Sequence, residues 1–144
     1  MNQQLSKFDV LERMMEGDNP NFSGEVLRGD AFPLKHTFAD GCYVREIFIP
    51  AGHVVIGKIH KHSHPNFLMQ GKVTVFTADE GTRHLQAPMS MISPAGTKRI
   101  VYTHTDTRWT TVHVTNKTDL DDIEEEVIAK TYLEAEEEAK CLGQ

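Results

Sequence analysis

A strand, a tight turn and a second strand follow one another in Tyr43-Val-Arg-Glu-Ile-Phe-Ile49, Pro50-Ala-Gly52 and His53-Val-Val-Ile-Gly-Lys-Ile-His60. Both runs are rich in β-branched and aromatic residues, which favour strands, and the Pro and Gly between them favour a turn. The same alternation continues to Thr115. It predicts an all-β domain built as a sandwich or barrel.

Six further β-type runs complete this pattern: Asn66–Met69, Lys72–Thr77, Arg83–Gln86, Ser90–Ser93, Arg99–His104 and Trp109–Thr115. Turn residues separate them at Pro65, Gln70-Gly71, Asp79-Glu-Gly81, Ala87-Pro88, Pro94-Ala-Gly96 and Thr105-Asp106. Eight short strands with Gly and Pro at the corners predict a small jelly-roll barrel over residues 43–115.

The segments on either side of the barrel have other patterns. Residues 1–42 begin with apolar residues at helical spacing from Leu5 to Met15, which predicts a short amphipathic helix, and continue as an irregular lead-in with one short strand near Val26. Residues 116–144 predict a C-terminal helix from Asp119, capped by Thr118, and then an acidic tail.

Composition excludes several functional classes. The 144 residues suit one domain, and a formal charge of -6 without a basic patch argues against a nucleic-acid-binding surface. No apolar run approaches the roughly 20 residues that span a bilayer, and the start of the chain has no apolar signal region. Cys42 and Cys141 lie outside any metal or redox spacing, so we expect reduced thiols and a cytoplasmic protein.

Three histidines occupy alternate positions: His60, His62 and His64. In an extended strand they would lie on one face, together with Lys58, but they would span about 13 Å, so a bend at Pro65 is needed for them to share an ion. His113 or His104 from the final strands could then complete a set of imidazoles for Zn²⁺, Fe²⁺, Mn²⁺ or Ni²⁺. The alternative is a polar lining without metal. Other histidines near turns, such as His36, are predicted to lie on the surface.

Turn residues at Pro50-Ala-Gly52, Gly71 and Pro94-Ala-Gly96, with the histidine strand between them, resemble the cupin family over about residues 43–115. The chain is similar, more narrowly, to short cupin-domain proteins of tailed bacteriophages, through segments such as Gly57-Lys-Ile-His60 and Trp109-Thr-Thr-Val-His113. The resemblance implies a cupin jelly roll and a site inside the barrel. It names no reaction.

The metal positions of the cupin motifs are only partly kept. Anchored on Gly71, the first motif places Lys58 and His60 at the family's two histidines and His64 at its glutamate. The second motif places Arg99 at its histidine. A guanidinium cannot coordinate a cation, but its planar fork suits a carboxylate or phosphate. A salt bridge from Arg99 to Glu46 or to another acid at the barrel rim is the alternative for this residue.

Three functions remain open. The first is a small-ligand-binding cupin, a homodimer, whose pocket takes an anionic metabolite or nucleotide; its predicted lining is Lys58, His60, His62, His64, Arg99 and His113. The second is a metal-dependent oxygenase, isomerase or epimerase with His60, His64 and His113 as ligands. The third is a structural or interaction protein that uses the barrel as a scaffold. For the dimer we expect contacts through the leading helix or through edges formed by Tyr43–Ile49 or Trp109–Thr115.

Overall fold

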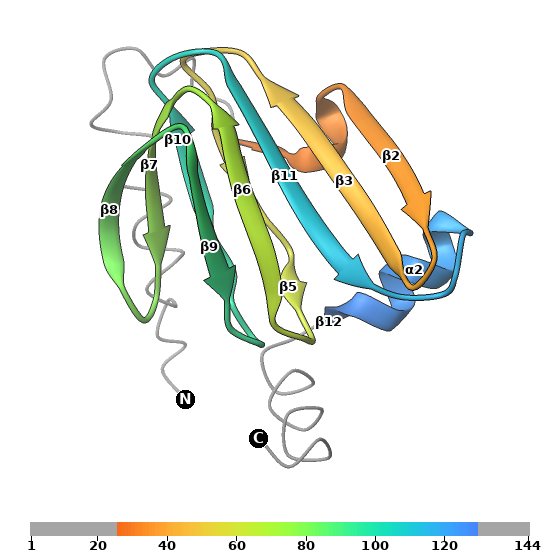
Figure 1. Ribbon diagram of the computed structural model, residues 1–144. Helices are drawn as coiled ribbons and strands as arrows, with labels where there is room; N and C mark the ends of the chain where they lie inside the picture. Colours follow the sequence, from red (N-terminus) through yellow and green to blue (C-terminus); the bar gives the residue numbers. More distant parts are fainter. Residues whose placement is uncertain (1–25, 130–144) are drawn as a thin grey trace.

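The computed structural model describes residues 26–129, and these form a jelly roll of two facing five-stranded sheets (Figure 1). The first sheet contains, in spatial order, β1 (Val26–Arg28), β4 (Val54–Ile56), β10 (Ile100–Thr103), β7 (Lys72–Thr77) and β8 (Gly81–Gln86). The second contains β2 (Leu34–Ala39), β3 (Cys42–Ile49), β11 (Thr107–Val114), β6 (His64–Gln70) and β9 (Met89–Ser93). A short 3-10 helix, η1 (Gly29–Ala31), joins β1 to β2. The all-β jelly-roll prediction is confirmed.

The strands follow the predicted runs with three differences. The predicted run His53–His60 divides into β4 and a two-residue β5 (Ile59–His60). Strand β2 was missed, because its sequence mixes polar residues with only one β-branched residue and was read as irregular. Strands β3 and β11 pair with each other inside the second sheet, so the prediction that they form edges was wrong. The leading helix predicted before Gly17 lies outside the described residues.

The apolar core fills one end of the barrel. Along β3 the inward side chains change from Tyr43 and Arg45 to Ile47 and Ile49, because successive residues of a strand alternate between its faces. The isoleucines pack with Leu68 of β6 and with apolar residues of the opposite sheet. The polar inward residues of β3 therefore lie toward the other end, where the core stops.

Helix α2 (Leu120–Val127) covers that other end of the barrel (Figure 1). Asp119, not the predicted Thr118, is its cap: the carboxylate accepts the backbone N–H groups of Asp121 and Asp122 at 3.0 and 3.1 Å. Ile123 and Val127 pack on Tyr43. After the helix, β12 (Ile128–Ala129) pairs with β5, so the covering helix is tied to the histidine segment. Among residues 26–129, no helix has the length and apolar character needed to cross a membrane.

Candidate functional site

A cavity of about 320 Å³ lies between the sheets and under α2. Inward side chains of β3 and β11 form one wall, apolar residues of β4 and β10 form the other, and Leu120, Ile123 and Val127 of α2 form the cover. The polar and charged residues that line it are His36, Tyr43, Arg45, Lys58, His60, Arg99, Thr111, His113 and Glu124. The described residues thus enclose a site large enough for a small organic molecule.

Strand register places several of these side chains in one row. His36 of β2 lies opposite Arg45 of β3, Arg45 lies opposite Thr111 of β11, and Thr111 lies opposite Asn66 of β6. Residues that are opposite each other in adjacent strands project from the same face of a sheet. These four residues, which we call the polar row, therefore lie side by side on the inner face of this sheet, and His36, Arg45 and Thr111 line the cavity.

Three histidine rings gather beside the polar row. The ring centroids of His60 and His64 are 4.2 Å apart, those of His64 and His113 are 4.9 Å apart, and those of His60 and His113 are 5.2 Å apart. We call them the histidine cluster. They meet because β5 ends at His60 and the chain bends before β6 begins at His64.

The prediction that His60, His62 and His64 lie on one extended strand was therefore wrong. The bend lies at residues 61 and 62, whereas Pro65, which was expected to cause it, is paired inside β6 with Ile92 of β9. His62 falls in the bend, and its backbone oxygen lies 3.3 Å from Nδ1 of His64. The structure brings His60, His64 and His113 together and leaves the ring of His62 outside the cluster.

The histidine cluster is uncharged at neutral pH. Burial, followed by the neighbouring charges of His64 and His113, lowers the pKa of His60 to about 2. Burial is also the largest cause that lowers the pKa of His64 and of His113 to about 4. The guanidinium of Arg99 adds to the lowering of all three pKa values. Three neutral imidazoles therefore face one another at pH 7.

The three rings of the histidine cluster do not form a preformed metal site in this arrangement. Nε2 of His64 is buried and has no hydrogen-bond partner among the described residues, which is a feature expected of a metal ligand. However, the planes of the His60 and His113 rings are nearly parallel, at 14°, and the rings stack on each other. Within residues 26–129, no group of three His, Cys, Asp or Glu side chains has the arrangement needed to hold an ion.

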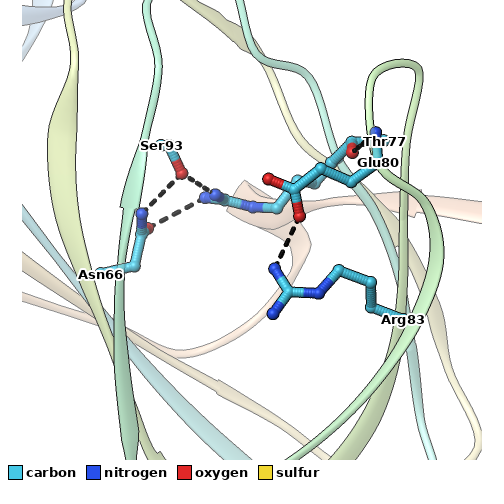
Figure 2. Close-up of polar contacts among 6 residues, drawn as sticks. Asn66, Thr77, Glu80, Arg83 and Ser93 are labelled. Atoms are coloured by element: carbon cyan, nitrogen blue, oxygen red, sulfur yellow. Dashed lines mark hydrogen bonds and ion pairs between the residues drawn. The ribbon is translucent and has the colours of Figure 1, made fainter.

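Arg99 is held by a network of neutral groups. Its Nη2 donates to Oδ1 of Asn66 at 2.9 Å, and its Nη1 donates to Oγ of Ser93. The same Oδ1 accepts the indole N–H of Trp109 at 3.1 Å, and Nδ2 of Asn66 donates to Ser93 at 2.7 Å. Figure 2 shows Asn66 and Ser93 on one side of this network and Glu80 with its partner Arg83 on the other.

Arg99 forms no ion pair with the described residues. The salt bridge to Glu46 was a wrong alternative, because Glu46 lies 3.9 Å from Arg108 on the outer face of the sheet. Burial lowers the pKa of Arg99 to about 10, although the charge of Glu80 opposes this shift. The positive charge is thus withdrawn from water and hydrogen-bonded to neutral acceptors, while the charge of Glu80 acts on it without a direct ion pair.

Lys58 contributes less positive charge to the cavity than the sequence predicted. Its Nζ pairs with a carboxylate oxygen of Glu124 on α2, and both side chains are about half exposed. The pair lies at the mouth of the cavity and joins the cover to the barrel.

Sequence reasoning missed five of the polar and charged lining residues: His36, Tyr43, Arg45, Thr111 and Glu124. His36 was predicted to be a surface residue, yet its Nδ1 lies 2.5 Å from the hydroxyl of Tyr43. Arg45 could have been found, because it holds an inward position in an otherwise apolar alternation along β3. His36 could not, because β2 itself was not predicted.

A scan against protein-family models found no match to the sequence, and a search of curated proteins also found none. Solved structures do match. Ectoine synthase from P. lautus superposes with a TM-score of 0.54 at 14% identity, over 67% of this chain and 72% of that one. A cupin-2 domain containing protein from Shewanella frigidimarina gives a TM-score of 0.48 at 10% identity, over 58% of this chain and 80% of that one.

An RmlC-like cupin family protein with a double-stranded β-helix fold, from Methanocaldococcus jannaschii, gives a TM-score of 0.47 at 13% identity, over 60% of this chain and 84% of that one. At such identities a likeness concerns the fold alone, and function must be argued from the site. The likeness to the ectoine synthase structure shows a shared fold, which in this chain is the jelly roll of two facing sheets described above.

Proposed function

We propose that the protein binds a small organic anion inside the barrel, under α2. The observation that carries this proposal is Arg99, a residue that lines the cavity and whose guanidinium forms no ion pair with the described residues. A charge withdrawn from water is costly unless an opposite charge compensates it. A carboxylate or phosphate in the cavity would supply that charge, and the guanidinium fork suits both groups.

The charges around the cavity support this choice. Among the described residues that line it, Arg45, Lys58 and Arg99 are cationic, and the one acid, Glu124, is paired with Lys58 at the mouth. This excess of cationic lining residues favours an anion over a cation. Neutral His60 and His113 add donor and acceptor atoms without adding charge.

A thermal-shift screen tests the proposal with three proteins. The wild type, Arg99→Lys and the control Arg108→Lys are mixed with a panel of small carboxylates, phosphate esters and nucleotides. A ligand at about 100 times its Kd stabilises the folded state by about 2.7 kcal/mol, which corresponds to a rise in Tm of roughly 5–10 °C. We expect such a rise for at least one anion with the wild type and with Arg108→Lys, and a smaller one with Arg99→Lys.

Arg99→Lys keeps the positive charge but loses the fork that holds Asn66 and Ser93. Arg108 is the matched control because it lies on β11, is about half exposed and faces outward. A flat response of folded wild-type protein to every anion would contradict the proposal. So would an equal response of all three proteins, because binding would then be independent of Arg99.

A metal-dependent enzyme is the second candidate. The observation that favours it is Nε2 of His64, which is buried beside two other neutral imidazoles and has no partner. Elemental analysis of protein purified without a histidine tag tests it, before and after incubation with Zn²⁺, Fe²⁺, Mn²⁺ or Ni²⁺. One bound ion per chain that is lost in His64→Ala would support this candidate. A metal content that stays well below one per chain after reconstitution would contradict it.

A further inference from the structure

Thr111 carries a hydroxyl that none of the described residues uses. The residue is 7% exposed, it lines the cavity, and within residues 26–129 its buried Oγ1 has no hydrogen-bond partner. Valine has nearly the same shape and favours strands equally well, so packing alone gives no reason for the hydroxyl at this position. An unsatisfied buried hydroxyl costs folding free energy, which points to a partner that arrives with a ligand.

The surroundings of Thr111 indicate the charge of that partner. Arg45 lies opposite Thr111 on β3, and Asn66 lies opposite it on β6. Asn66 in turn holds the guanidinium of Arg99. The hydroxyl of Thr111 therefore lies in the polar row between two arginines that both line the cavity. A hydroxyl can donate one hydrogen bond, and a carboxylate oxygen accepts it.

The next row of side chains is apolar. Ile47 and Trp109 follow Arg45 and Thr111 on the same two strands, and Ile49 lies beyond them. Val55 and Val101 of the opposite sheet complete this part of the lining. A ligand whose charged group binds at the polar row must therefore place an apolar part here. The sugar and base of a nucleotide would leave several polar atoms unpaired in the same space.

We infer that Thr111 is a ligand-binding residue and that the ligand is a small carboxylate with an apolar body. Its carboxylate group lies at the polar row, and its apolar body lies against Ile47, Ile49 and Val101. This inference rests on the proposed anion-binding function and makes it more specific: it names the orientation and the chemical class of the ligand.

Trp109 gives a direct measurement, because it is the only tryptophan of the chain and lines the cavity. Its fluorescence is titrated with three probes: hexanoate, the neutral analogue hexanamide, and adenosine monophosphate. Three variants accompany the wild type. Thr111→Val removes the hydroxyl, Thr111→Ser keeps it, and Thr110→Val changes the neighbouring threonine, which projects from the other face of β11.

We expect hexanoate to bind the wild type, Thr111→Ser and Thr110→Val with similar Kd values, and to bind Thr111→Val about tenfold or more weakly, as is usual for a lost hydrogen bond to a charged group. Hexanamide and adenosine monophosphate should bind the wild type more weakly than hexanoate. Without ligand, Thr111→Val should have a Tm equal to or above that of the wild type, because an unsatisfied hydroxyl is removed. That result separates a binding role from a structural one.

Unchanged hexanoate binding by Thr111→Val would overturn the role of Thr111 and leave the anion-binding function intact. Tighter binding of adenosine monophosphate than of hexanoate would overturn the ligand class. If neither anion changes the Trp109 fluorescence and the thermal-shift panel is also flat, the proposed function itself fails, and this inference fails with it.

Discussion

The guanidinium carbon of Arg99 lies 5.1 Å from the centre of the Trp109 ring, and both side chains donate to Oδ1 of Asn66. The indole face stabilises the cation, and the shared amide oxygen fixes its orientation. Neither interaction neutralises the charge. The arrangement thus holds a guanidinium rigidly at the cavity wall and leaves its charge for a ligand, which is the kind of preorganisation that favours binding.

Replacing the shared amide by a carboxylate tests this arrangement. Asn66→Asp has nearly the same shape and would place a negative charge against Arg99. We expect the variant to bind anions at least tenfold more weakly, because the internal pair competes with the ligand. Isothermal titration with the tightest anion of the panel measures the effect. The exposed Asn116→Asp is the matched control and should bind as the wild type does. Equal binding by both variants would contradict the role given to Arg99.

The histidine cluster predicts a loss of stability in mild acid. The pKa values of His64 and His113 are lowered to about 4 in the folded protein, whereas unfolded histidines titrate near 6.5. As pH falls below about 6.5, the unfolded state takes up protons that the folded state cannot, so stability is lost down to about pH 4. Each histidine contributes up to about 1.4 kcal/mol per pH unit in this range.

Urea unfolding between pH 7 and pH 4.5 measures this dependence. His113→Gln should reduce the slope of unfolding free energy against pH, whereas the exposed His84→Gln should leave it unchanged. NMR gives a second readout, since the ring signals of the cluster should not titrate above pH 5. A cluster that titrates near pH 6.5 would show that the rings are solvated and that the cavity is open.

We expect Glu124, at the cavity mouth, to affect the rate of anion binding more than the stability of the folded protein. Glu124→Gln breaks an ion pair that is about half exposed, and such pairs contribute only about 0–1 kcal/mol. The variant leaves Lys58 unpaired, so an anion should associate faster at low salt, and the difference should shrink as salt screens the charge. Stopped-flow fluorescence of Trp109 measures the rate. Glu125→Gln, on the same helix and exposed, is the control. Identical rates for both variants would place the entry path elsewhere.

Replacing Ile123 tests whether α2 packs on the barrel as a fixed part of the fold. Its side chain is 2% exposed and packs with Tyr43 and Val127. Ile123→Ala should lower the free energy of unfolding by about 2–4 kcal/mol, as is usual for a large buried residue. Ile92→Ala, at a 66% exposed position, should cost less than about 1 kcal/mol. Equal costs in urea unfolding would mean that the helix does not pack on the barrel as described.

The strands could be predicted from the sequence because their signals are local. Runs of β-branched residues between Gly and Pro, such as Lys72–Thr77, were found nearly to the residue. Strand β2 was missed because its propensity is weak, and pairing with β3 gives it its conformation. The C-terminal helix was predicted from its apolar spacing, one residue from its cap.

The site was harder to predict because it depends on register between distant strands. The chain bends between His60 and His64, and this bend is a tertiary feature that the alternating histidines did not reveal. The resemblance to cupins placed Arg99 in the barrel, but nothing local distinguished Thr111 from ordinary strand residues, and only the apolar alternation along β3 set Arg45 apart. These two residues acquire their position only when β3 and β11 pair.

A crystal structure of the protein with its tightest anion would give the most decisive test of binding inside the barrel. We expect density for the anionic group within hydrogen-bond distance of a guanidinium nitrogen of Arg99 and of Oγ1 of Thr111, with α2 in place over the cavity. An anion bound outside the barrel, with only water between Arg99 and Thr111, would contradict it.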